Sequence, residues 1–164
     1  MTMLTEYFLD ISAELSYAKE WWDKRNPVFA DFSGLGGDCT SFVSQCLYAG
    51  GAAMNYTPDY GWYFSSLGDR SAAWSGVEYF YRFIISNRGA GPFGHTVPVR
   101  EAETGDVIQL CRENGCYHSL FVTGARGGEI YIAAHSTDAY DRPLSSYSYK
   151  AARCLRIRKA RRYV

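Results

Sequence analysis

The stretch "GLGGDCTSFVSQCLYAGG", residues 34–51, decides the fold that we expect for this chain. Glycines lead into Asp38 and Cys39, and a pair of glycines follows Ala49. Asp is favoured just before the first turn of a helix, and glycine is favoured just after the last turn. The stretch therefore predicts a helix from about Cys39 to Ala49, with Cys46 on its buried apolar face.

Cys39 is the first candidate for chemistry, because it stands at the predicted start of this helix. A helix N-terminus carries partial positive charge and unpaired N–H groups, which favour a thiolate and could stabilise an oxyanion. Buried helical cysteines are often packing residues, and position alone does not separate the two interpretations for Cys39. For Cys46, in mid-helix, packing is the favoured interpretation. No C-x-x-C pair occurs, so we expect no metal site.

Three histidines could provide the base for such a thiolate: His95, His118 and His135. His118 lies near the start of a predicted strand at 116–124, and His135 lies near the end of the next strand at 129–136. If these strands pair across the turn between them, residues whose numbers add to about 253–255 face each other. His118 and His135 then lie side by side at one sheet edge, or one register step apart, which would give an imidazole a polar partner. His95, in a Gly- and Pro-rich loop, is interpreted as structural or close to substrate.

The rest of the sequence predicts helices first and strands afterwards, within a single domain of residues 1–164. The apolar spacing of residues 4–24 predicts a helix, and Ser75 with Glu78 forms a capping-box pattern for another. Later the period changes to two, which predicts strands at 106–112, 116–124, 129–136 and 153–160. This order indicates an α+β fold in which N-terminal helices pack on a C-terminal antiparallel meander.

Composition restricts the possible partners. The chain has 164 residues, of which 47% are hydrophobic and 21% charged, so it can bury a core. Its 17 basic and 17 acidic residues cancel, which argues against nucleic acid as a partner. There is no apolar run long enough for a membrane span, and the acidic N-terminus is unlike a signal peptide. We expect a monomer that is either cytosolic or part of a longer secreted or cell-wall protein.

Cys111 and Cys116 flank a predicted turn. They could form a disulfide across it or remain two reduced thiols, and the sequence leaves both open.

Several sequence blocks together resemble one known family. The resemblance covers about residues 15–160, and the pairing of the D-C-T-S-F-V-S-Q block with the later H-S is specific. The family is the "putative amidase" domain of Gram-positive bacteria, related to the NlpC-type and CHAP-type papain-like cysteine amidases and peptidases. The blocks are "DFSGLGGDCTSFVSQCLYAGG", "GWYF", "GDVIQL", "HSLFVT" and "YIAAHSTDAYDRPL".

The resemblance implies a papain-like fold and a catalytic role for four residues. Cys39 matches the nucleophile and His118 the base. His135 occupies the third position, which orients the base in NlpC-type enzymes, and Asp138 is a competing orienter. One departure is Gly37, where the resemblance leads us to expect Asn.

The implied activity is hydrolysis of an amide, in a cell-wall peptide such as peptidoglycan or a related substrate, with no metal or organic cofactor. The aromatic residues of 56–74 either wall the cleft or only pack the long loop. Two alternatives remain open: a non-catalytic cell-wall or peptide-binding module, and an acyl or amide transferase on the same fold. The residues expected to contact substrate are Asp38, Trp62, Tyr63, Trp74 and Ser119.

Overall fold

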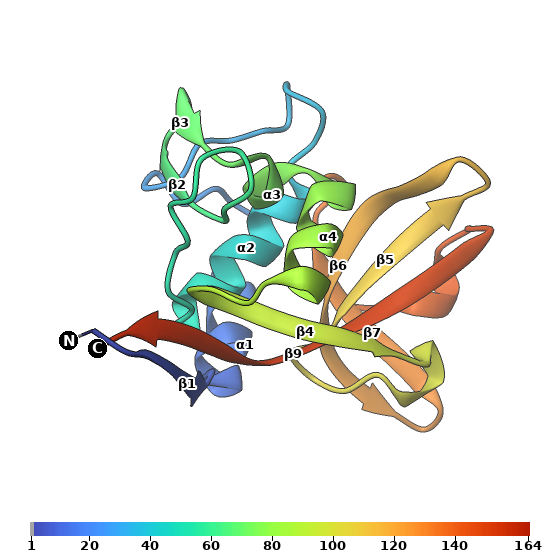
Figure 1. The fold of residues 1–164 in the computed structure, drawn as a ribbon. Coiled ribbons are helices and arrows are strands. Elements are labelled where there is room, and N and C mark those ends of the chain that lie inside the picture. Colours follow the sequence, from blue (N-terminus) through green and yellow to red (C-terminus); the bar gives the residue numbers. More distant parts are fainter. Residues whose placement is uncertain (1) are drawn as a thin grey trace.

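A long antiparallel sheet forms the framework of the molecule (Figure 1). The computed structural model describes residues 2–164. The strands of the sheet follow the order β1-β9-β5-β6-β7-β8, and β4 also pairs with β9. Their bounds are Leu4–Phe8 for β1, Gly91–Val97 for β4, Val107–Arg112 for β5, Gly115–Arg126 for β6, Glu129–Ala134 for β7, Ala139–Pro143 for β8 and Ala151–Tyr163 for β9.

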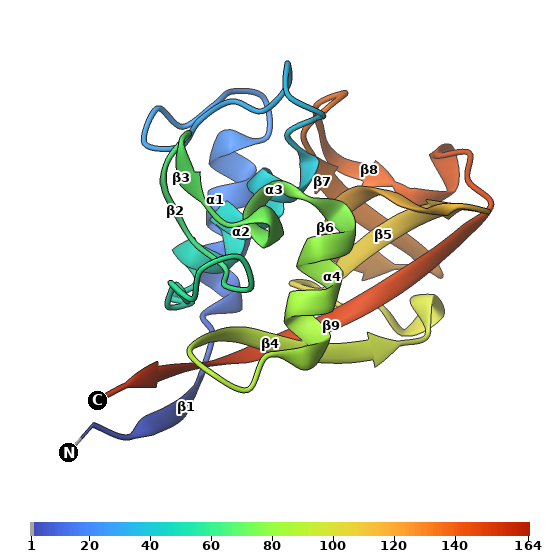
Figure 2. The same cartoon turned by 45° about the horizontal axis from the view of Figure 1, so that its top comes forward.

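The helices gather on one side of this curled sheet (Figure 2). They are α1 (Ile11–Trp21), α2 (Cys39–Ala49), α3 (Ala72–Ser75) and α4 (Val77–Ser86). Two 3-10 turns, Val99–Glu101 and Leu144–Ser146, and a small hairpin of β2 (Phe64–Ser66) and β3 (Asp69–Arg70) complete the fold. No helix within residues 2–164 is both long and apolar enough to cross a membrane.

Successive residues of each central strand enter two different cores. Phe121 of β6 packs in the core between the helices and the sheet, together with Phe42 of α2. Its neighbours Leu120 and Val122 pack in a second core on the other face of the sheet. This alternation follows from the period of two in a strand, and it decides which side chains can reach α2.

The predicted α+β class is confirmed, and so are α2 and the four predicted strands. The predicted helix over residues 4–24 is wrong in its first part, because Leu4–Phe8 forms β1 instead. This segment pairs with β9 from Leu4↔Tyr163 to Phe8↔Lys159, a partner at the other end of the chain. The helix starts after Asp10, whose side chain accepts a hydrogen bond from the Ala13 N–H at 3.0 Å.

The predicted capping box is also wrong. Gly76 precedes α4 as its N-cap, with no side-chain cap. Glu78 accepts hydrogen bonds from the Cys116 N–H at 2.9 Å and from Arg153 at 3.1 Å, so tertiary partners take the carboxylate. The Gly- and Pro-rich segment around His95, expected to be a loop, is strand β4. The backbone hydrogen bonds of β4 go to β9, so pairing with a distant strand outweighs the low strand propensity of this segment.

Candidate active site

Cys39 is the first residue of α2, and its side chain lines a cavity of about 330 Å³. The residue is only 7% exposed. The glycines before it form one wall, and Gly37 has a φ of +108°, a conformation that other residues rarely adopt. The remaining lining comes from β3, α3 and α4, with Arg70, Ala72, Ser75, Gly76, Val77 and Tyr79.

The thiol of Cys39 is held in its neutral form in this conformation. Burial raises its pKa, and this effect exceeds the lowering by the Ser119 backbone N–H and by the hydroxyl and backbone N–H of Thr40. The Thr40 hydroxyl lies 3.8 Å from the sulfur. Position at a helix N-terminus alone therefore does not produce the thiolate that the sequence led us to expect.

Asp38 does not cap α2 with its side chain, contrary to our expectation, and it is fully buried. Its Oδ1 accepts a hydrogen bond from the Phe32 N–H at 2.9 Å. Its Oδ2 lies 2.5 Å from His135 Nδ1 and 3.4 Å from Arg25 Nε. Burying a carboxylate is costly without such partners, and the Asp38 side chain is directed inward, toward His135 and Arg25.

His135 is also fully buried, with its ring stacked on Phe42 at a centroid distance of 4.0 Å. Its Nε2 lies 2.7 Å from the carbonyl oxygen of Trp21. Both ring nitrogens thus lie within hydrogen-bond distance of oxygen atoms. This imidazole holds Asp38 in place, and in this conformation it has no nitrogen left for the thiol.

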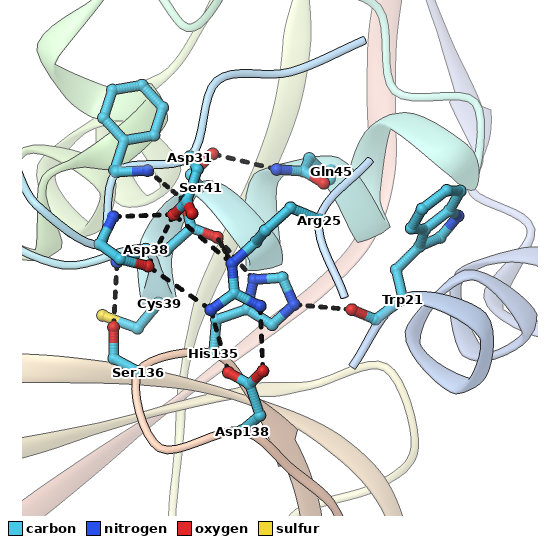
Figure 3. Close-up of polar contacts among 12 residues, drawn as sticks. Trp21, Arg25, Asp31, Asp38, Cys39, Ser41, Gln45, His135, Ser136 and Asp138 are labelled. Carbon is cyan, nitrogen blue, oxygen red and sulfur yellow. Dashed lines mark hydrogen bonds and ion pairs between the residues drawn. The ribbon is translucent and has the colours of Figure 1, made fainter. Parts of the chain in front are cut away.

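The loop after β7 is fastened to the start of α2 (Figure 3). The Asp38 N–H donates to Ser136 Oγ at 3.0 Å. Asp138 receives two hydrogen bonds from Arg25, at 3.0 and 3.1 Å. Arg25 also lies within ion-pair distance of Asp31, at 3.5 Å. Asp138 therefore orients Arg25 and the loop, and sequence patterns gave no signal for Arg25 or Ser136.

His118 faces the other side of the sheet from Cys39. The next residue, Ser119, points toward α2, where its hydroxyl lies 2.9 Å from that of Thr40. Successive strand residues point to opposite faces, so the His118 ring lies toward the second core, 6.1 Å from the ring of Tyr147. Burial, with a smaller contribution from Arg142, lowers the pKa of His118 to about 4.

The predicted pairing between β6 and β7 is confirmed: Phe121 faces Ala133 and Val122 faces Ile132. Continued in this register, His118 is one step out of line with His135, which places their side chains on opposite faces. Of the two arrangements that the sequence allowed, the structure adopts the second. β7 ends at Ala134, so the flank of His118 on this side has no strand partner.

Most of the residues expected to contact substrate are buried. Trp62 and Trp74 are both 0% exposed and pack on each other at 4.9 Å in the helical core, which corrects their expected role in the cleft. Ser119 is also fully buried. Tyr63 lines an open cavity of about 680 Å³, which shares Arg70 with the cavity at Cys39. The sequence gave no indication of Arg70.

The other cysteines have structural surroundings. Cys46 is fully buried in the helical core, in agreement with packing. Cys111 and Cys116 form a disulfide across the β5–β6 hairpin. Cys154 packs in the second core.

Comparison with known proteins identifies the relatives of this chain. An uncharacterized protein of Bacillus subtilis (strain 168), YhbB, is 34% identical over an alignment of 144 residues; the match covers 83% of this chain and 43% of that protein. The chain therefore spans less than half the length of that relative. No solved structure matches the chain significantly. A family profile described as "Putative amidase domain" matches residues 9–157, nearly the whole chain. The chain belongs to this amidase domain family, and the membership suggests a hydrolase acting on amide bonds.

Proposed function

We propose that this protein is a cysteine-dependent amidase or peptidase of papain-like type, related to NlpC-type and CHAP-type enzymes, with Cys39 as its nucleophile. The observation that carries the proposal is the place of Cys39: first in a buried eleven-residue helix, with its side chain in a cavity. Helix amides without helical partners lie at this position and can donate to an oxyanion. Membership in the amidase family supports the same reaction class.

In the proposed reaction the Cys39 thiolate attacks the amide carbonyl and forms a tetrahedral oxyanion. The backbone N–H of Cys39 contributes to the site that holds this oxygen. The C–N bond then breaks, and a protonated base gives its proton to the leaving amine. Water, activated by the same base, hydrolyses the thioester and restores the thiol.

His118 is the base that we propose. His135 has both ring nitrogens engaged, and His95 lines a separate cavity with Phe93 and Arg156. The Thr40 hydroxyl lies 3.8 Å from Cys39 Sγ and 2.9 Å from the hydroxyl of Ser119, so the residue after His118 lies close to the thiol. β7 ends at Ala134 and leaves β6 unpaired on that side of His118, and in this proposal substrate binding rearranges the β6 backbone there and brings the ring to the face of Cys39. In this proposal His135, Asp38 and Asp138 hold the start of α2 and the adjacent loop.

The proposed substrate is an amide of a cell-wall peptide, which is the class that the family resemblance implies. The test incubates the protein with purified peptidoglycan and with synthetic peptides, and measures released amines. Cys39→Ala should abolish release, whereas the matched control Cys46→Ala should retain it. Release that survives Cys39→Ala would overturn the proposal.

One observation favours a second candidate function, a non-catalytic peptide-binding module. The thiol is neutral and buried, and no imidazole contacts it in the conformation described for residues 2–164. Such a module would bind peptidoglycan equally well with Cys39→Ala and would release no amine. Trapping a thioester between Cys39 and a peptide ester, read by mass spectrometry, would exclude it.

A further inference from the structure

Arg70 lies where the two cavities of the active-site face meet. The smaller cavity, about 330 Å³, contains Cys39, and the larger one, about 680 Å³, contains Tyr60 and Tyr63. Arg70, Ala72 and Tyr79 line both. A ligand that extends from the thiol into the larger cavity would therefore lie along Arg70, Ala72 and Tyr79.

The guanidinium is fixed in position without being neutralised. Its Nη1 donates to the carbonyl oxygen of Leu67 at 2.5 Å, and its Cζ lies 4.8 Å from the ring centroid of Phe32. Phe32 is itself held by its N–H bond to Asp38. The support of Arg70 thus leads directly to the residue that precedes the proposed nucleophile.

One edge of this guanidinium has no acceptor. Nε is buried and has no hydrogen-bond partner in the part of the chain that the structure describes, where Arg70 also forms no ion pair. An unpaired buried N–H is costly and calls for a partner. Nη1 is engaged with Leu67 and Nε is shielded from solvent, so Nη2, which has no hydrogen-bond partner within residues 2–164, is the group left for a ligand. A guanidinium N–H donates well to a carboxylate oxygen.

We propose that Arg70 binds a carboxylate of the substrate and thereby directs the amidase to amide bonds close to an acidic group. This inference rests on the proposed function and specifies its substrate class. The scissile amide would lie at Cys39, and the carboxylate would lie at the junction between the two cavities. The carboxylate could belong to a chain terminus or to an acidic side chain, and both share the same chemistry.

The binding test uses Cys39→Ala, so that turnover plays no part. Three probes are titrated: N-acetyl-trialanine with a free carboxylate, its C-terminal amide, and N-acetyl-Ala-Glu-Ala amide. The readout is the NMR signal of the Arg70 Nε–H. At least one acid should bind about tenfold or more tightly than the neutral amide, and Arg70→Gln in the same background should remove the difference. The first acid reports a terminal carboxylate and the third probe a side-chain carboxylate.

A second test measures how fast Cys39 is alkylated by iodoacetate and by iodoacetamide. The ratio of the two rates cancels the reactivity of the thiol itself. Arg70→Gln should lower this ratio several-fold, Arg70→Lys should lower it less, and the charge-matched control Arg88→Gln should leave it unchanged. Equal binding of acids and amide, or no binding by either acid, would overturn the proposal for Arg70. A retained preference for acids without amine release would instead overturn the proposed hydrolysis.

Discussion

His118 and Ser119 are neighbours on β6, yet they lie in two different environments. Ser119 faces α2, and its hydroxyl lies within hydrogen-bond distance of Thr40 and Gln109, at 2.9 and 3.0 Å. His118 lies on the face of Leu120, beside the ring of Tyr147. The polar network around Ser119 lies on the face of the sheet that the helices cover, and His118, the proposed base, lies on the opposite face. On the β7 side, β6 has no strand partner at His118, because β7 ends at Ala134.

The strongest test of this comparison is His118→Ala. If the ring turns to Cys39 during turnover, its removal should lower kcat by about 10²–10⁴-fold, the usual effect of losing a general base. Amine release under saturating substrate measures it. His95→Ala is the matched control and should keep wild-type turnover, because His95 lies on β4 in a separate cavity. An unchanged kcat in His118→Ala would mean that His118 is not the base for Cys39.

Asp38→Ala tests the helical face by removing the shared acceptor of its network. The change leaves His135 and the Phe32 N–H buried without their partner. Breaking a buried charge pair costs about 3–5 kcal/mol, so the free energy of unfolding should fall by about that amount in urea denaturation. Asp31→Ala, which removes an exposed carboxylate 3.5 Å from Arg25, should cost less than about 1 kcal/mol. Similar losses in both variants would contradict the central role of Asp38.

Glu14 is a buried carboxylate of the same helical face that lacks such partners. Neither oxygen has a hydrogen-bond partner within residues 2–164, and burial, followed by the charge of Asp10, raises its pKa well above the usual range. Glu14→Gln should therefore stabilise the protein at pH 7, by about 1 kcal/mol or roughly 2–4 °C in Tm.

Varying the pH tests whether the charge of Glu14 causes this expected stabilisation. Above the usual glutamate pKa the unfolded chain releases a proton that folded Glu14 retains, so stability falls as pH rises. The advantage of Glu14→Gln should shrink as pH falls below that value. Glu20→Gln on the exposed part of α1 serves as control and should change Tm little. A stabilisation that is independent of pH would show that charge is not the cause.

A further pH dependence is expected from His118. Its pKa is lowered to about 4, so between its usual value and about pH 4 the unfolded chain binds a proton that the folded chain does not. His118 should therefore make the protein less stable as pH falls through this window. Unfolding curves of His118→Phe should show a weaker acid sensitivity there. An identical slope would mean that the ring is already accessible to water.

Local sequence patterns were sufficient to predict several of the helices and strands. The Asp38-Cys39 start and the Gly50-Gly51 end predicted α2 with its observed bounds, although the Asp38 side chain does not cap the helix as expected and only the glycine end works as the local pattern predicted. Period-two alternation predicted β5 to β7, and the short turn between β6 and β7 predicted their register. The sequence failed for β1 and β4, because both depend on β9, which lies far away along the chain.

The sequence by itself determined that a cysteine begins a buried helix and that two histidines lie near one end of a hairpin. Only the tertiary structure decided what surrounds them. A register difference of one residue turns His118 away from α2, and burial holds the Cys39 thiol neutral. Asp38 turned inward to His135, and Arg70 lies between two cavities, because such contacts join segments about 100 and 30 residues apart, beyond any local pattern.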